Sequence, residues 1–381
     1  MHHQNSVFHG LLKRVPWDEL ERLAVEHRSD FRVRRLTTKS QFIALLYGQL
    51  SGASSLRDVV TRLESQAALL YHLGGKSVAR STLAEANAKR SSEVFMALFA
   101  AMAKQVHRGL RRKISETTYL IDATSVRLNG FSQWAHFSTG VFGAKAHVIY
   151  DADADCPIYA AVTAANVTDI TAAQLMPIEP GATYVFDLGY YNYRWWATLD
   201  TQGCRIVTRF KSSTPLDVVE DLPLPEGSTL LSDRIGHLPE RQAASRRNPF
   251  QDPVREVRLK LDSGKILRLL SNDLDASAQE IADLYKRRWA IELFFRCIKQ
   301  GLKIKKFLGT SQNAVRIQIA VALIAFLLLR LAHAAQSAVK TPLAFARLVA
   351  ANLMMRRRID RLLGPPTPPD RPQPQLALQW A

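Results

Sequence analysis

The chain has 381 residues, of which 47% are hydrophobic and 22% charged, and its formal net charge at pH 7 is +17. This composition excludes a disordered chain, and the length suggests two or three domains. The three cysteines are far apart and lack metal-ligand spacing, which excludes a disulfide framework and a zinc site and indicates a reducing, cytoplasmic compartment. The longest apolar run, residues 319–329, is too short to span a membrane and predicts a buried helix.

The positive charge is concentrated toward the two ends of the chain. Residues 1–113 carry 19 Lys or Arg against 9 Asp or Glu, and residues 281–363 carry 16 against 3. The middle, residues 114–280, carries 15 against 21. Two basic segments around an acidic middle predict a polyanionic partner such as nucleic acid. The alternatives are charge that serves only solubility, and an anionic membrane surface, which no basic amphipathic helix supports.

The predicted elements begin with helices. Apolar residues recur at helical spacing through residues 42–63, a break follows at residues 74–77, and the next helix exposes Lys89 and Arg90. A helix, a turn and a basic helix are typical of a unit that reads DNA, and small helical bundles in general share this pattern. We therefore expect residues 1–110 to form an all-helical DNA-binding domain.

From residue 117 the pattern changes to strands. A short helix at 168–178, with Asp169 interpreted as its cap, separates β-prone runs at 118–121, 146–150, 157–162, 183–186 and 204–210. This order predicts a mixed α/β sheet. Residues 211–270, rich in Pro, Asp and Ser, predict a small β insertion.

The last predicted elements are helices followed by a tail. Ser277 and Glu280 have capping-box spacing and predict the start of a long helix. A buried helix is expected at residues 313–335, and the Pro-rich stretch from residue 364 predicts an extended tail.

Two acids follow apolar strands in this scheme. Asp122 comes after Tyr119 to Ile121, and Asp187 comes after Tyr184 to Phe186. A carboxylate at a strand end lies at the sheet edge, where α/β folds bind ligands. The alternative for either acid alone is an ordinary turn or cap aspartate.

A third acid lies in a strongly basic helix. Between residues 285 and 306 there are eight Lys or Arg and one acid, Glu292. On a regular helix this carboxylate shares an arc of about 60° with a phenol, a guanidinium and an ammonium, from Tyr285, Arg288 and Lys299. The alternative is a salt-bridged helix in which Glu292 pairs with Arg288 and Arg296.

Three carboxylates suit a divalent metal site. Asp122, Asp187 and Glu292 offer hard oxygen ligands, which favour two Mg²⁺ ions, with Mn²⁺ as a substitute. Two such ions can activate an attacking hydroxyl and stabilise the leaving oxygen of a phosphodiester. The neighbouring basic residues are suited to hold phosphates in line.

The spacing Tyr285-x2-Arg288-x3-Glu292-x6-Lys299 resembles the signature of DDE transposases from bacterial insertion sequences of the IS-four type. Asp122 in Leu-Ile-Asp-Ala-Thr and Asp187 in Phe-Asp-Leu-Gly-Tyr are similar to the first and second family aspartates, with Leu188 where the family usually has Arg. The resemblance covers residues 1–340, and residues 3–80 resemble the helical domain of this branch.

The resemblance implies an α/β fold with an RNase H-like catalytic domain, a β-strand insertion and an N-terminal all-helical DNA-binding domain. The implied divisions are 1–110 (helical), 111–210 with 271–340 (catalytic), 211–270 (insertion) and 341–381 (C-terminal helix and Pro-rich tail). It implies that Asp122, Asp187 and Glu292 are catalytic and bind metal, and that Tyr285, Arg288 and Lys299 contact DNA phosphates. Some members stack a flipped base on an aromatic side chain, for which the candidates are Trp195, Trp196 and Trp289.

The resulting expectation is a cut-and-paste DNA transposase that binds terminal inverted repeats and catalyses metal-dependent strand cleavage and strand transfer. Its partners are double-stranded DNA, at transposon ends and target, and a second copy of the chain in a synaptic homodimer. We expect a cytoplasmic, nucleoid-associated protein with no membrane association. The alternatives are a non-catalytic DNA-binding regulator derived from a transposase, and an RNase H-like nuclease.

Overall fold

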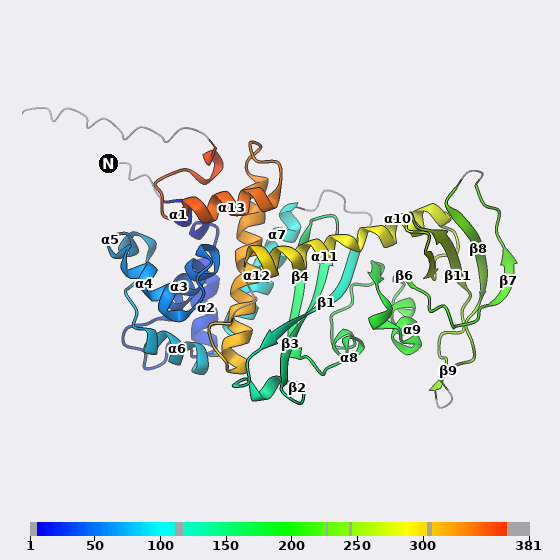
Figure 1. Cartoon of the computed structure of the whole chain (residues 1–381), viewed down its shortest axis with the longest axis horizontal. Coiled ribbons are helices and arrows are strands. Elements are labelled where there is room, and N and C mark those ends of the chain that lie inside the picture. The colour runs from blue at the N-terminus through cyan, green and yellow to red at the C-terminus, as the bar shows by residue number, and fades with distance from the viewer. Residues whose placement is uncertain (1–5, 111–116, 226–227, 244–245, 303–306, 364–381) are drawn as a thin grey trace, which may run out of the picture.

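The computed structural model describes residues 6–110, 117–225, 228–243, 246–302 and 307–363. The Pro-rich tail and the predicted domain boundary at residue 111 lie outside these ranges. In Figure 1 the N-terminal helices lie at one end of the molecule, a mixed sheet occupies the centre, and further strands extend to the opposite end.

The described part of the N-terminal segment is helical throughout. Its elements are α1 (Val7–Leu12), α2 (Trp17–Glu26), α3 (Thr38–Ser51), α4 (Leu56–Glu64), α5 (Ala67–Leu70), η1 (Tyr71–Leu73), α6 (Arg80–Lys89) and α7 (Glu93–Leu110). Hydroxyl side chains cap three of the starts: Ser6 accepts the amide of His9, Thr37 that of Ser40, and Ser55 that of Asp58. These helices share one apolar core with the C-terminal part of the chain.

The helix that completes this core is α12 (Gln312–Ala334), which begins at the N-cap Ser311. It matches the buried helix predicted at 313–335 and packs against α3, α6 and α7 (Figure 1). By length and composition α12 could cross a membrane, but 83% of its most apolar window is buried inside the protein. Two C-terminal elements, α13 (Pro342–Asn352) and η5 (Ile359–Arg361), pack against it.

Within the described residues, one ten-stranded mixed sheet forms the centre, in the order β2-β3-β1-β5-β6-β12-β11-β8-β7, with β4 also paired to β3. Its first strands are β1 (Thr118–Leu128), β2 (His136–Ser138), β3 (Val141–Asp151), β4 (Cys156–Ala164), β5 (Thr183–Phe186) and β6 (Arg205–Arg209). β1, β5 and β6 are parallel, whereas β3 and β4 are antiparallel to their neighbours.

The predicted insertion continues this sheet. Its strands are β7 (Asp217–Asp221), β8 (Leu230–His237), β11 (Val254–Lys260) and β12 (Ile266–Ser271), and β12 pairs with β6. A separate two-stranded sheet pairs β9 (Arg241–Ala243) with β10 (Arg246–Arg247) in antiparallel orientation. A buried ion pair joins Arg255 on β11 to Asp233 on β8, with Nη2 2.6 Å from Oδ2.

Three short helices, α8 (Asp169–Ala173), η3 (Leu188–Tyr190) and α9 (Tyr193–Thr201), cover one face of the central strands. A further short helix, η2 (Gln133–Ala135), contacts β3 and β4 and places Trp134 against the first core. α9 and η3 share a second apolar core with β5 and β6, in which Trp195 and Trp196 are buried. This packing explains the strength of the apolar pattern around residues 184–210.

The helix that carries the signature residues is divided into three pieces, which corrects the expectation of one regular helix. These are α10 (Ala278–Arg287), α11 (Trp289–Arg296) and the π-helical turn η4 (Cys297–Gly301). At the first junction the amide of Arg288 donates to Tyr285, three residues back, which tightens the turn. The three pieces still follow one another across the sheet (Figure 1).

Candidate functional site

Asp122 and Asp187 lie at the same level of two adjacent parallel strands. Thr118 pairs with Thr183 and Leu120 with Val185, so the same register brings position 122 level with position 187. Asp187 follows β5 as predicted and caps η3 by accepting the amide of Gly189 at 2.8 Å. The prediction that Asp122 ends a strand is wrong, because β1 continues to Leu128 in an alternating pattern that the apolar run did not show.

α11 brings Glu292 to the same edge through Arg288. The Arg288 guanidinium donates to Glu292 Oε1 at 2.6 Å and lies 3.8 Å from Asp122 Oδ2. The predicted alternative, a salt bridge between Glu292 and Arg288, is therefore present. Arg288 also lies close to a second acid, Asp122 on β1. One cation thus joins two of the three predicted catalytic carboxylates.

Tyr285 and Lys299, the other two signature residues, lie on either side of Arg288 and Glu292 along the helical segments. The Tyr285 ring lies 5.6 Å from the Arg288 guanidinium carbon, and the negative charge of Asp187 acts on its hydroxyl. Lys299, in η4, lines a small apolar cavity beside Thr124, two residues beyond Asp122 on β1. The four signature residues therefore lie along α10, α11 and η4, the helical segments that cross the sheet beside the predicted catalytic acids.

Burial raises the pKa of Asp122 to about 6, and the negative charges of Asp187 and Glu292 act in the same direction. The amide of Ala123 and the Arg288 guanidinium oppose the shift. Three carboxylates thus repel one another in a partly desolvated site. A polyvalent cation would relieve this repulsion.

We predict that Asp122→Asn stabilises the metal-free protein at pH 8. The folded-state pKa lies above the unfolded value of about 3.9, so the ionised carboxylate destabilises the fold by an amount that grows as pH rises from 4 to 6. A shift of this size corresponds to at most about 3 kcal/mol. Urea unfolding in EDTA should show a gain of about 1–3 kcal/mol at pH 8 and a smaller gain at pH 5. An equal or lower stability of the variant at pH 8 would contradict the prediction.

The three carboxylates are chemically suited to a hard divalent cation, but the Arg288 guanidinium lies between the side chains of Asp122 and Glu292. Within the described residues, no three His, Cys, Asp or Glu side chains are grouped closely enough to hold a metal ion. The Asp and Glu oxygens of the site are the ligand type that Mg²⁺ prefers. Arg288 must therefore leave Glu292 before all three acids can share an ion.

The sequence interpretation missed Asp169. Thr168 is the N-cap of α8, so the prediction that Asp169 caps this helix is wrong. Its carboxylate instead accepts Lys145 Nζ at 3.0 Å and lies beside Gly189, next to Asp187. No sequence signal separates this acid from a cap, because β3, α8 and η3 meet only in the folded chain.

The three candidate tryptophans differ in exposure. Trp195 and Trp196 are buried in the second core, whereas Trp289 is 52% exposed on α11, three residues before Glu292. Only Trp289, of the three, can meet a ligand without rearrangement.

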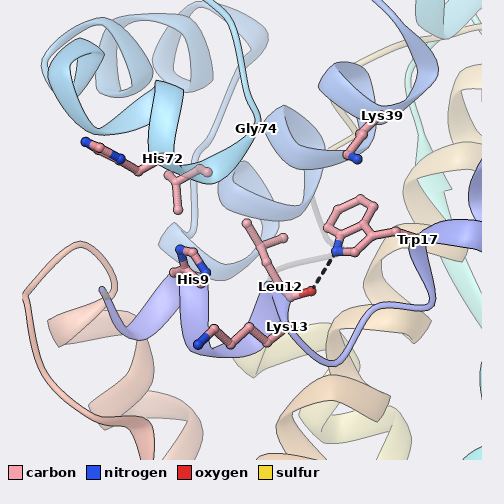
Figure 2. Close-up of a pocket in the computed structure, with 8 residues that line it drawn as sticks. His9, Leu12, Lys13, Trp17, Lys39, His72 and Gly74 are labelled. Carbon is pink, nitrogen blue, oxygen red and sulfur yellow. Dashed lines mark hydrogen bonds between the residues drawn. The ribbon is translucent and has the colours of Figure 1, made fainter. Parts of the chain in front are cut away.

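A separate basic pocket lies among the N-terminal helices (Figure 2). It has a volume of about 210 Å³, and its polar lining includes His9, Lys13, Lys39 and His72. Trp17 forms another wall and donates its indole N–H to Leu12 O at 3.1 Å. Among the lining residues there is no acid, although Lys39 pairs at 3.1 Å with Glu21 outside the pocket.

Comparisons with known proteins agree on one family. Residues 114–328 match the model described as "Transposase DDE domain", and residues 3–76 match a domain of unknown function. A protein of Sinorhizobium fredii (strain NBRC 101917 / NGR234), named "Putative transposase y4zB", is 40% identical over 288 residues, which cover 74% of this chain and 80% of that protein. A "Probable transposase for insertion sequence element IS5377" of Geobacillus stearothermophilus is 28% identical over 249 residues, covering 62% and 63%.

One solved structure resembles the fold at a low level. It is a piggyBac transposase synaptic complex with hairpin DNA, at 13% identity and a TM-score of 0.43, covering 95% of this chain and 81% of that one. Likeness at this level does not establish a shared fold.

Proposed function

The chain belongs to the family of transposases with a DDE domain, and from this premise we propose that Asp122, Asp187 and Glu292 are its catalytic carboxylates. The protein is a DNA transposase and thus an enzyme that cleaves and transfers DNA strands. We propose further that it is of the IS-four type, that its catalytic domain is RNase H-like, and that it acts at the terminal inverted repeats of its own element. The parallel register of Asp122 and Asp187, with Glu292 tied to Asp122 through Arg288, is the observation that supports the site.

The acids would bind Mg²⁺, or Mn²⁺ in its place. When bound, two such ions would activate the attacking water or 3′-hydroxyl and stabilise the leaving oxygen. Asp122 lies on β1 and Asp187 directly follows β5, so the sheet fixes the backbone positions from which the two carboxylates extend. Glu292 comes from a helix and is the carboxylate that must exchange its Arg288 partner.

Tyr285, Arg288 and Lys299 are proposed to contact DNA phosphates. A phosphate near Glu292 offers the Arg288 guanidinium a bidentate partner in place of the carboxylate. Arg288 would thereby release Glu292 as DNA arrives, which makes completion of the site depend on the substrate. We propose that Trp289, rather than the buried Trp195 or Trp196, stacks on an unpaired base, because it is exposed beside Arg288.

We predict that Lys299→Ala slows end cleavage about 10- to 100-fold while overall DNA binding falls by less than about threefold. One phosphate contact close to the scissile bond positions the substrate, whereas affinity is spread over many contacts. Single-turnover cleavage and a gel-shift titration measure the two effects. Lys260→Ala, on the exposed end of β11, is the matched control, and unchanged cleavage by Lys299→Ala would refute the phosphate role.

The basic N-terminal helices are proposed to hold DNA outside the cleavage site. The pocket of His9, Lys13, Lys39 and His72 supports this, because two ammonium groups and two imidazoles line one hollow (Figure 2). We propose a synaptic homodimer in which two copies each hold one end, and a cytoplasmic, nucleoid-associated location. The division into helical (1–110), catalytic (111–210 with 271–340) and inserted (211–270) parts remains part of this proposal.

The test is cleavage of DNA that carries the native flanks of the gene. Purified protein with Mg²⁺ should nick these flanks at defined positions, and the Asp187→Asn variant should bind without nicking. Scrambled flanks serve as the sequence control. Binding without cleavage by the unaltered protein would favour the regulator, and cleavage of the scrambled DNA at the same rate would favour a nuclease.

A further inference from the structure

The position of Asp169 indicates more than a structural ion pair. Oδ1 takes the Lys145 ammonium, while Oδ2 faces the turn after β5. A methyl group added at Gly189 would lie 3.1 Å from Asp169 Oδ2 and 3.0 Å from Asp187 Oδ1. Because both oxygens lie this close to the same added methyl group, Asp169 Oδ2 and Asp187 Oδ1 are at most about 6 Å apart. One water or hydrated cation between Asp169 and Asp187 could bind both carboxylates.

A buried hydroxyl lies among the same acids. The Tyr190 side chain is fully buried, and its Oη has no hydrogen-bond partner among the described residues. The charges of Asp122, Asp169 and Asp187 all act on this hydroxyl, and together with burial they raise its pKa well above the usual range. Buried hydroxyls are nearly always hydrogen-bonded to protein or to ordered water. The Tyr190 hydroxyl therefore points to a bound water among these carboxylates.

His147 adds a second polar atom of the same kind. Its ring is fully buried, and Nε2 lies 2.8 Å from Thr163 Oγ1. In the part of the chain that the structure describes, Nδ1 has no hydrogen-bond partner and lies 3.8 Å from Asp169 Oδ1. Burial lowers the pKa of His147 to about 4, so this imidazole is neutral at pH 7. Asp169 thus has one fixed cationic neighbour, Lys145, and keeps its second oxygen for the site.

A purely structural role would make Asp169 and Lys145 equal partners. Lys145, however, also donates to the carbonyl of Val167 at 3.1 Å, so it anchors the loop before α8 without the carboxylate. Thr168 caps α8 through its own hydroxyl, so the helix start does not need Asp169 either. Within the described ranges, the contacts of Asp169 with Lys145 and His147 both involve Oδ1, whereas Oδ2 lies beside Gly189.

We propose that Asp169 is a fourth carboxylate of the acidic site, which together with the Tyr190 hydroxyl holds a water bound to the divalent cation of Asp122 and Asp187. This inference rests on the proposed metal site and assigns to it a positioning residue beyond the three acids. Asp169 orients the bound water through Oδ2, and Tyr190 completes the hydrogen bonds of that water. Such outer partners commonly change metal affinity 10- to 100-fold.

Mn²⁺ binding without DNA tests the proposal, with the signal of free Mn²⁺ measured by electron paramagnetic resonance. Asp169→Asn keeps the size of the side chain and should weaken Mn²⁺ binding about tenfold. Lys145→Met breaks the same ion pair but leaves the carboxylate, and it should bind Mn²⁺ as tightly as the unaltered protein or more tightly. Tyr190→Phe should weaken binding by a smaller factor.

Each outcome has a distinct meaning. Equal weakening by Asp169→Asn and Lys145→Met, matched by equal losses in melting temperature, would overturn the proposal in favour of a structural ion pair. Unchanged affinity in Asp169→Asn would overturn it directly. If the unaltered protein and Asp187→Asn bind Mn²⁺ equally poorly, the proposed metal site itself fails, which the first two outcomes do not imply.

Discussion

Glu292→Gln should slow strand cleavage at least about a thousandfold and leave DNA binding intact. A thousandfold loss corresponds to about 4 kcal/mol of transition-state stabilisation, which is the scale expected when a metal-binding carboxylate becomes neutral. Gln has the same shape and still accepts a hydrogen bond from Arg288, so α11 should fold as before. Because the change also removes a negative charge from a basic segment, affinity for DNA should stay equal or rise slightly.

The control for this variant is Glu280→Gln, near the start of α10. Glu280 pairs with Arg205 at 2.7 Å, and its side chain is half exposed. The Glu280→Gln variant therefore makes the same chemical change in the helical segments that carry Glu292, but outside the acidic site. Its cleavage rate should stay within about threefold of the unaltered rate. Normal cleavage by Glu292→Gln, or an equal loss in both variants, would rule out the assigned role of Glu292.

Asp233→Ala should lower the free energy of unfolding by about 3–5 kcal/mol, because it leaves the Arg255 guanidinium buried without its counter-charge. Both side chains are less than a tenth exposed, and Arg255 Nε and Nη2 both donate to the carboxylate. Arg255 also donates to the carbonyls of Leu274 and Ala276, just before the N-cap Ser277 of α10. Loss of this ion pair should therefore also disturb the start of α10 and the helical segments that carry the signature residues. We expect the rate of strand cleavage to fall as well.

An exposed ion pair of the same strand gives the comparison. Arg234 pairs with Asp221 at 2.8 Å, with the Asp221 side chain 69% exposed, and Asp221→Ala should change stability by less than about 1 kcal/mol. The double change Asp233→Leu with Arg255→Met should recover much of the stability that Asp233→Ala loses. Urea unfolding of the four proteins measures these differences, and equal effects of Asp233→Ala and Asp221→Ala would contradict the assignment.

The parts of the site predictable from sequence are those with a local signal. Asp187 follows a short apolar strand, and Glu292 is the one acid in a basic segment, so both stand out without a structure. The prediction of Asp122 rests partly on a wrong strand end. The apolar run stops at Asp122, whereas β1 continues to Leu128 with buried and exposed residues in alternation. The buried helix α12 was predictable because its apolar run has the length of a core helix.

The remaining features arise from contacts between distant segments. Asp169 approaches Asp187 only because β3 holds α8 against the turn after β5. The pairing of β12 with β6, which joins the insertion to the central sheet, follows no pattern within either strand. The Arg288 side chain contacts two acids, Glu292 from the next turn and Asp122 from β1, and helical periodicity predicts only the first.

The position of α12 has a consequence for how the chain is made. The N-terminal helices α3, α6 and α7 bury their apolar faces against a helix that the ribosome supplies more than two hundred residues later. Until α12 emerges, those faces lack their native cover, so a chain that ends before residue 312 lacks a stable helical body even where it already contains Glu292. Such fragments should be cleared by proteolysis rather than persist as DNA-binding competitors. The body that is proposed to hold the DNA is thus completed only after all three acids have been synthesised.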